Sequence, residues 1–161
     1  MGQKIHRYHV EKDAIEGDKH IIDASTSRAK LTDISKYKNS GASGAVDIGV
    51  SGSPATIQSL SPDAGFTNLL PLTVKGTPSG LGTAESATFH VIATLDDGTT
   101  AEIATRTTAA GSTATEVITQ ADYDFTGIGD GRRITKIDVT AESSATATSA
   151  TADVTITAVE C

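Results

Sequence analysis

Apolar residues alternate with small or polar residues along most of the chain beyond residue 45. Alternation with period two, rich in β-branched side chains, indicates strands that bury one face. The clearest alternations predict strands at 46–50, 70–74, 87–95 and 154–158, and weaker ones predict strands at 55–60, 101–106, 115–119 and 133–142. Gly, Pro, Ser and Asp separate these segments, as is typical of turns. The pattern therefore predicts an all-β chain, an antiparallel β-sandwich of the immunoglobulin-like or jelly-roll type.

One hairpin can be specified by its register. The segment 96–98, Asp-Asp-Gly, separates two predicted strands. A two-residue loop would mix buried and exposed residues on one face. A three-residue loop sets Ala93 opposite Ala101 and Val91 opposite Ile103, and it keeps the apolar residues together. We therefore expect a type I turn whose final glycine adopts the left-handed conformation in a G1 bulge.

The alternation also predicts which residues share a face. Leu70, Leu72 and Val74 are expected on one half-buried face. The last two strands are expected to pair with Val139 opposite Ile156, and the chain between them would form a projecting tip rich in Ser, Thr and Ala. The residues expected in the core are Phe89, Val91, Leu95, Ile103, Val139, Val154 and Ile156.

The N-terminal part of the chain shows a different period. Leu31, Ile34 and Tyr37 recur every three residues after the hydroxyl-bearing segment 25–27. This spacing predicts a short amphipathic helix capped by hydroxyl groups. A helix of this length is marginal alone, so it needs a surface to pack against. That surface is either the rest of the chain or a partner, and the sequence leaves both open.

Charge and composition change close to residue 42. Residues 1–40 carry eight Lys and Arg against six Asp and Glu, whereas residues 41–161 carry five against fourteen. The stretch 39–44, rich in Gly and Ser, is typical of a flexible connection. We therefore divide the chain into an N-terminal arm with a short helix and a Gly/Ser hinge, residues 1–42, and a β-sandwich body, residues 43–161.

Length and composition restrict the possible partners. A chain of 161 residues suits one domain with an appended arm. Its formal net charge of −7 disfavours nucleic-acid binding, and no apolar run approaches the roughly 18 residues of a membrane span. A single cysteine, Cys161, excludes an intramolecular disulfide. Large hydrophobic residues are few, so we expect a thin core and stabilisation by homo-oligomerisation, as a dimer or trimer.

Two glycine-rich segments resemble functional loops only in part. The segment 127–131, Gly-Ile-Gly-Asp-Gly, runs into a strand pattern, whereas a dinucleotide-binding loop opens a helix. The segment 49–53 lacks the final glycine of a nucleophile elbow and has no helix after it. No acid, base and nucleophile set is otherwise apparent. We therefore expect no cofactor and no enzymatic activity.

Several charged residues could hold an ion. Asp122, Asp124 and Asp130 could converge on calcium, although the spacing matches no EF-hand loop and a solvated acidic loop is the competing interpretation. The N-terminal histidines have no recognised zinc-ligand spacing and are expected at the surface. They are His6, His9 and His20.

The paired basic residues Arg132 and Arg133 stand out in the acidic body. We expect them to balance the neighbouring carboxylates of Asp130 and Asp138 rather than to form an anion site.

In general design, a charge-distinct arm joined through Gly and Ser to a Thr-rich β body resembles the capsid decoration (cement) proteins of tailed double-stranded DNA viruses, which include bacteriophages. The resemblance implies a structural virion protein on the capsid surface, assembled in the host cytoplasm, with the major capsid protein as partner. The alternative is an immunoglobulin-like, tail-associated binding module that recognises a receptor or a carbohydrate. Three Tyr, three Phe and no Trp leave few aromatics for sugar stacking, which counts against that alternative.

We expect the arm to anchor the protein to a larger assembly. Apolar side chains of the helix would pack on the partner, lysines would face an acidic surface, and an extended segment would add a strand to a sheet edge. The residues are Leu31, Ile34 and Tyr37 as apolar anchors, Lys30, Lys36 and Lys38 as cations, and Ile5, Tyr8 and Val10 in the added strand.

Overall fold

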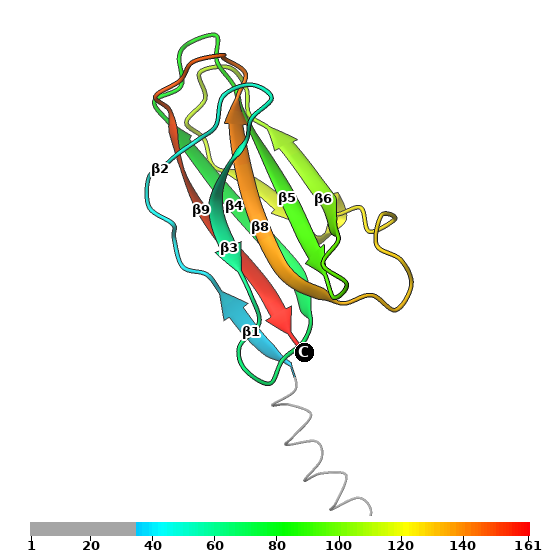
Figure 1. Cartoon of the computed structure of the whole chain (residues 1–161). Helices are drawn as coiled ribbons and strands as arrows, with labels where there is room; N and C mark the ends of the chain where they lie inside the picture. Colours follow the sequence, from blue (N-terminus) through cyan, green and yellow to red (C-terminus); the bar gives the residue numbers. More distant parts are fainter. Residues whose placement is uncertain (1–34) are drawn as a thin grey trace, which may run out of the picture. The chain divides into compact units, whose positions relative to one another are not determined.

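The structure, a computed structural model, describes residues 35–161. This part of the chain contains nine strands and one short 3-10 turn (Figure 1). In chain order they are β1 (Lys36–Asn39), β2 (Val46–Asp47), β3 (Ala55–Leu60), β4 (Leu69–Ser79), β5 (Ala87–Leu95), β6 (Thr100–Thr107), β7 (Glu116–Thr119), η1 (Gln120–Asp122), β8 (Ile134–Ser143) and β9 (Thr151–Glu160). The all-β prediction is confirmed, and the weaker alternations also correspond to strands.

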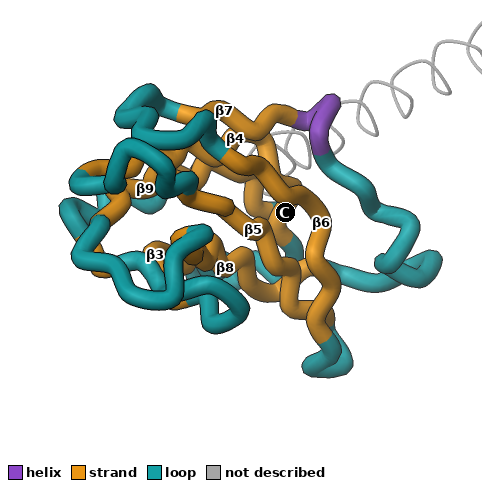
Figure 2. The backbone as a smooth tube through the Cα atoms, turned by 90° about the horizontal axis from the view of Figure 1, so that it is seen from above, coloured by secondary structure: helices purple, strands orange, loops and turns teal. Residues whose placement is uncertain are grey.

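The strands form two antiparallel sheets that face each other as two layers (Figure 2). Sheet A has the order β1-β9-β4-β7, with β2 also paired to β9, and sheet B has the order β3-β8-β5-β6. With β1 and β2 counted as one edge strand, consecutive strands alternate between the sheets except for the β5–β6 hairpin. This is the strand order of a jelly roll, one of the two topologies that the sequence left open.

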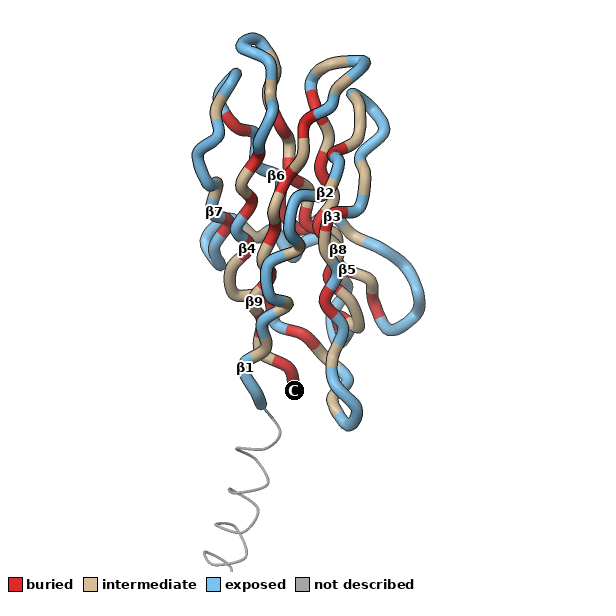
Figure 3. The backbone as a smooth tube through the Cα atoms, turned by 90° about the vertical axis from the view of Figure 1, so that its left-hand side faces the viewer, coloured by how far each residue is buried: buried red, intermediate tan, exposed pale blue. Residues whose placement is uncertain are grey.

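The core lies between the two sheets, and buried positions alternate with outward ones most regularly along β5 and β9 (Figure 3). In β5 and β9 every second residue is buried, as the period-two pattern requires. All seven residues expected in the core are buried, none of them more than 6% exposed. The largest of these side chains is Phe89 of β5.

The β5–β6 hairpin has the three-residue loop expected from the sequence. The Leu95 N–H donates to the Thr99 carbonyl at 2.8 Å, and the Gly98 N–H donates to the Leu95 carbonyl at 3.0 Å. Gly98 has φ of 84°, so the left-handed conformation of the G1 bulge is confirmed. Ala93 pairs with Ala101, as the predicted register requires.

The register changes further along this hairpin. Val91 lies opposite Ala104 instead of Ile103, because a bulge shifts the pairing between Val91 and Ile92. Both Ile103 and Ala104 are buried as a result. Two consecutive inward residues break a strict alternation, so the predicted Val91–Ile103 pair is wrong by one residue.

Replacing Gly98 with valine should destabilise the protein by about 1–3 kcal/mol, because a β-branched residue resists a positive φ. The midpoint of urea denaturation measures the change. Gly98→Asn is the matched control, since asparagine tolerates the left-handed region and should cost less. Equal midpoints for the valine variant and the parent would contradict the role of this turn.

The last two strands do not form the expected hairpin. β8 and β9 belong to different sheets, and Val139 pairs with Val91 while Ile156 pairs with Val74. The loop between them crosses from one sheet to the other. Alternation identifies the face of a strand that is buried, but it does not identify the neighbouring strand. Two strands that are adjacent in sequence can therefore face each other across the core.

The face of β4 also differs from its prediction. Leu70 is 50% exposed, whereas Leu69 is fully buried. The pairing with β9 shifts between Pro71 and Thr73, and this irregularity lets Leu69, Pro71 and Val74 all reach the core side. A bulge of one residue inverts the face of every residue before it, so Leu70 and Val74 cannot share a side.

The segment that precedes β3 follows the edge of β9. Tyr37, expected at the end of the arm helix, lies in the extended strand β1. The stretch 39–44, expected to be a flexible connection, is hydrogen-bonded along β9 and leads into β2. The compact unit accordingly runs from Tyr37 to Cys161. The rest of the helix prediction, including Leu31 and Ile34, lies outside the described residues.

Two serine hydroxyls complete the hydrogen bonding of this edge. The Ser40 N–H donates to the Ile156 carbonyl, and the Ile156 N–H donates to Ser40 Oγ, both at 2.9 Å. The same exchange, again at 2.9 Å, joins Ser43 to Val154. The backbone of residues 39–44 departs from a regular strand, and the serine hydroxyls supply the acceptors that carbonyl groups would otherwise provide.

The assignment of β1 to the body changes the charge balance of the arm. Lys36 and Lys38 lie in β1. Residues 1–34 then carry six basic and six acidic residues, whereas residues 35–161 carry seven and fourteen. The basic excess expected of the arm therefore comes from the first strand of the body.

Candidate interaction surface

Exposed apolar side chains gather on the strands of sheet A. The large hydrophobic residues exposed in the described part of the chain are Tyr37 in β1, Leu70 in β4, Val117 in β7 and Phe125 in the loop after η1. The first three belong to sheet A, and Leu70 and Val117 stand next to buried residues of their strands. We call the outward surface of this sheet the sheet A face. It comprises Tyr37, Asn39, Leu70, Thr73, Lys75, Val117, Asp153, Thr155, Thr157 and Val159.

Strand register sets the neighbours on this face. Leu70 pairs with Val159, which forms an apolar area at one end of the sheet. Lys75 pairs with Thr155 on one side and with Val117 on the other. Cross-strand partners lie about 5 Å apart, so each row forms a continuous surface.

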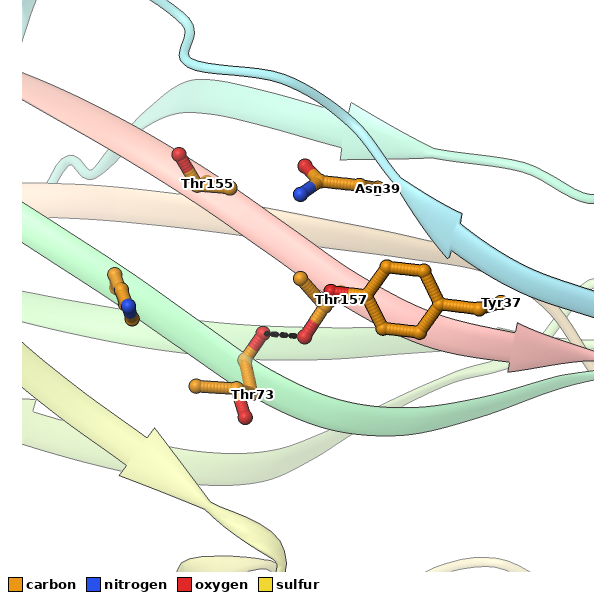
Figure 4. Close-up of a pocket in the computed structure, with 6 residues that line it drawn as sticks. Tyr37, Asn39, Thr73, Thr155 and Thr157 are labelled. Carbon is orange, nitrogen blue, oxygen red and sulfur yellow. Dashed lines mark hydrogen bonds between the residues drawn. The ribbon is translucent and has the colours of Figure 1, made fainter.

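A shallow depression of about 200 Å³ lies within the sheet A face. Its lining residues are Tyr37, Asn39, Thr73, Lys75, Thr155 and Thr157 (Figure 4). The hydroxyl of Thr157 donates to the carbonyl of Thr73 at 3.1 Å, which ties β9 to β4 at its floor. Tyr37 is 61% exposed, so its ring forms an open wall that a ligand or partner can contact.

Lys75 differs from the other cations of the body. The described basic side chains other than Lys75 all have polar partners. They are Lys36, Lys38, Arg106, Arg132, Arg133 and Lys136. Lys75 is exposed and, among the described residues, has neither an ion pair nor a hydrogen bond. Its charge is therefore available to an external carboxylate.

Lys38 does not face outward as the arm hypothesis required. Its ammonium group contacts the carboxylates of Asp63 and Glu160, the latter at 3.5 Å. The Glu160 side chain is fully buried and also accepts the Asp63 N–H at 2.8 Å. Lys38 therefore supports the fold. Glu160 occupies an inward position of β9. Because acidic residues are usually exposed, its burial could not be predicted from the sequence.

The other residues proposed to contact a partner divide into two groups. Lys36 and Tyr37 lie in β1, and Tyr37 belongs to the sheet A face. The remainder lie outside the described residues, so their roles stay predictions. They are Ile5, Tyr8, Val10, Lys30, Leu31 and Ile34.

The arginine pair has different partners from those expected. We expected Asp130 and Asp138 to balance Arg132 and Arg133, but both arginines contact the β5–β6 turn. Arg132 Nη2 lies 2.7 Å from Asp97 Oδ2. The pairing of β5 with β8 brings this turn beside the chain that enters β8, and sequence spacing alone does not show that.

On the outward surface of sheet B, ionisable groups engage one another. His90 Nδ1 lies 2.7 Å from Glu102, and its other ring nitrogen lies 3.7 Å from Glu142. Burial raises the pKa of Glu102, but hydrogen bonds from Thr105 and His90 outweigh it, so the pKa is lowered. Glu102, His90 and Glu142 thus link β6, β5 and β8 and leave few polar groups for a partner.

The acidic loop after β7 uses its carboxylates in local turns. Asp122 accepts the Thr119 N–H at 2.8 Å, and Asp124 accepts the Thr126 N–H at 2.9 Å. These bonds hold the pKa of both aspartates below its ordinary value. In residues 35–161 no three His, Cys, Asp or Glu side chains are grouped to hold a metal ion. His6, His9 and His20 lie outside the described residues.

Acid should destabilise the fold. The carboxyl groups whose pKa is lowered are Glu85, Asp97, Glu102, Asp122 and Asp124. A carboxyl group whose pKa is lower in the folded than in the unfolded protein stabilises the fold at pH values above its unfolded-state pKa, 4.5 for Glu and 3.8 for Asp. This stability is lost as the pH falls through the folded-state pKa. The thermal midpoint should therefore drop as pH is lowered from neutrality towards about pH 3.

The variant Glu85→Gln should flatten this dependence, because a hydrogen bond from Ser143 is the largest cause of the lowered pKa of Glu85. A midpoint that stays constant over the acid range in the parent protein would contradict the expectation.

Comparisons with known proteins identify no family. No family model matches the chain, and no curated protein matches it. Solved structures of infectious bursal disease virus show a distant likeness. The Gt strain structure gives a TM-score of 0.45 at 14% identity over 78% of this chain and 32% of that chain. The structure of the VP2 subviral particle gives a TM-score of 0.42 at 13% identity over 78% of this chain and 36% of that chain. The chain thus spans about a third of the length of these proteins.

Within residues 35–161 no helix has the length and apolar character that crossing a membrane requires.

Proposed function

We propose that this protein is a structural, non-enzymatic virion protein, a capsid decoration (cement) protein. In this proposal the N-terminal arm binds the outer surface of the shell, and the body stabilises the shell as an oligomer. The partner is the major capsid protein, and assembly takes place in the host cytoplasm. The observation that carries the proposal is the jelly-roll strand order of the body, whose two sheets enclose a core between residues 48 and 158. The arm enters the proposal as the expectation drawn from the sequence.

The topology of the body supports this role by analogy. Jelly rolls occur in virus capsid domains and in lectin domains, where two packed sheets give a rigid block with loops at both ends. Fold alone does not determine function, so the arm supplies the second element of the proposal. Segments that become ordered on binding can extend over a neighbouring surface and pair with its sheet edges.

The structure defines where to cut the chain in a test of the arm. A chain that starts at Ser35 retains β1, with Lys38 and its contacts to Asp63 and Glu160. A chain that starts at Ser43 lacks them and serves as the comparison. We expect the 35–161 chain to keep β-rich circular dichroism and the parent thermal midpoint, and the 43–161 chain to be less stable.

Binding is measured by co-sedimentation with capsids from the virus that encodes the chain, after removal of the native copies. The full chain should sediment with the shells, and the 35–161 chain should remain in the supernatant. Equal binding by both would show that the arm is not the anchor. Absence of the protein from purified particles, measured by mass spectrometry, would exclude the virion role.

A further inference from the structure

We infer that the sheet A face is the surface through which two copies of this chain associate face to face. The inference rests on the proposed function, in which copies on the shell form an oligomer. It names the surface that carries out that association, and that surface lies entirely within the described body.

The apolar side chains of the face provide the driving force. Tyr37 and Leu70 are 61% and 50% exposed, and Val159 lies beside Leu70 in the register. Exposed large hydrophobic residues on one side of a domain mark an interaction site more often than scattered ones do. Thr and Asn side chains separate them, a composition typical of an interface between proteins that also exist apart.

The opposite face of the sandwich lacks these features. The charged outward residues of sheet B already have partners: Glu102 and Glu142 contact the His90 ring, and Lys136 pairs with Asp138. No large hydrophobic residue on its strands is exposed. The difference between the two faces therefore selects sheet A as the surface that a partner covers.

The charges on the face indicate a second copy as the partner. Lys75 has no partner among the described residues, and Asp153 lies on the same face, two residues along β9 from Thr155. Asp153 accepts the Gly44 N–H at 3.1 Å and the Ser43 hydroxyl at 3.3 Å, both through Oδ1, so these bonds use one of its two carboxylate oxygens. The face thus carries one available cation and one carboxylate, so two identical faces can meet with opposite charges opposed. Most homo-oligomers use such self-complementary two-fold interfaces.

The acidic body supplies further carboxylates to a Lys75 side chain from another copy. Residues 35–161 carry fourteen acidic against seven basic residues. The depression beside Lys75, with Tyr37 as its wall, can receive a side chain of that copy (Figure 4). Buried aromatic and cationic residues in such pockets commonly dominate the energy of an interface.

The test uses the full chain and measures its mass by sedimentation equilibrium across a wide concentration range. The parent should show a monomer–dimer equilibrium. Leu70→Asp should raise the dimer dissociation constant by about tenfold or more, because it buries a charge against apolar groups. Lys75→Glu should also weaken association, because the face would then carry two negative charges. Phe125→Asp is the matched control, since Phe125 is similarly exposed but lies off the face.

Each outcome bears on the inference. A parent that stays monomeric at millimolar concentration overturns it, as does equal weakening by Phe125→Asp and Leu70→Asp. Hydrogen exchange in β1, β4 and β7 that does not change with concentration also overturns it, because the face would then be covered by the chain's own arm or by nothing. Dimers that fail to bind capsids overturn the proposed function alone, and monomers that bind capsids overturn this inference alone.

Discussion

Replacement of Phe89 by alanine should destabilise the protein by about 3–5 kcal/mol. The ring is 1% exposed and extends from β5 of sheet B to the backbone of β4 in sheet A. A Cβ atom at Gly76 of β4 would lie 2.7 Å from the ring, so glycine is the residue that leaves room for it. Loss of the ring opens a cavity between the sheets that the surrounding small residues cannot fill.

Chemical denaturation with urea measures this effect, and Ile92→Ala is the matched control. Ile92 is on the same strand but points outward, half-buried on sheet B, so its truncation should cost much less. Typical domains are stable by about 5–15 kcal/mol, so the Phe89 variant should lose a large share of the parent's stability and unfold at a markedly lower urea concentration. A change below about 1 kcal/mol would mean that the ring does not hold the sheets together.

The second large effect should come from Ser40 and Ser43. The double variant Ser40→Ala/Ser43→Ala removes the acceptors of the Ile156 and Val154 backbone N–H groups. A partly buried N–H group that loses its acceptor costs about 1–3 kcal/mol, so we expect a loss of about 2–4 kcal/mol for the pair. Hydrogen exchange at the two amides should accelerate in parallel, since they lie on the edge of β9.

The matched control for this pair is Ser51→Ala, an exposed serine in a turn, which should have little effect. The double variant Ser40→Thr/Ser43→Thr retains the hydroxyl groups and should recover part of the stability. Unchanged stability in the alanine double variant would show that water replaces both hydroxyls at this edge.

Sequence patterns predicted the faces of most strands, but of the strand pairings they predicted correctly the β5–β6 hairpin and not β8 with β5 or β9 with β4. The alternation of Phe89, Val91 and Leu95 placed all three in the core, because a half-buried strand requires period two. The bulges near Ile103 and Pro71 broke that period. The first has no local sequence signal, whereas a proline inside a central strand is itself typical of a bulge. The pairing of β8 with β5 depends on how all strands cross between sheets, which is a property of the whole chain.

The candidate surface was predicted only in part. Tyr37 was expected to contact a partner, and that contact stays a prediction; its side chain is 61% exposed on the sheet A face. The helix expected to carry it was wrong at this residue, since a spacing of three in a short segment does not exclude an extended strand. Lys75 gave no signal in the sequence, because its lack of a partner depends on the positions of every carboxylate around it.

The place of β9 in sheet A has a consequence for the synthesis of the protein. β9 has β1 and β2 on one side and β4 on the other, and β8 lies between β3 and β5. The two strands that are synthesised last therefore occupy central positions in their sheets. A growing chain that has not yet reached residue 134 can form the β5–β6 hairpin but neither complete sheet. Folding must therefore wait for almost the entire body to leave the ribosome, and the contacts that complete it join distant parts of the chain. We expect slow folding, with unpaired strand edges exposed meanwhile to neighbouring nascent chains.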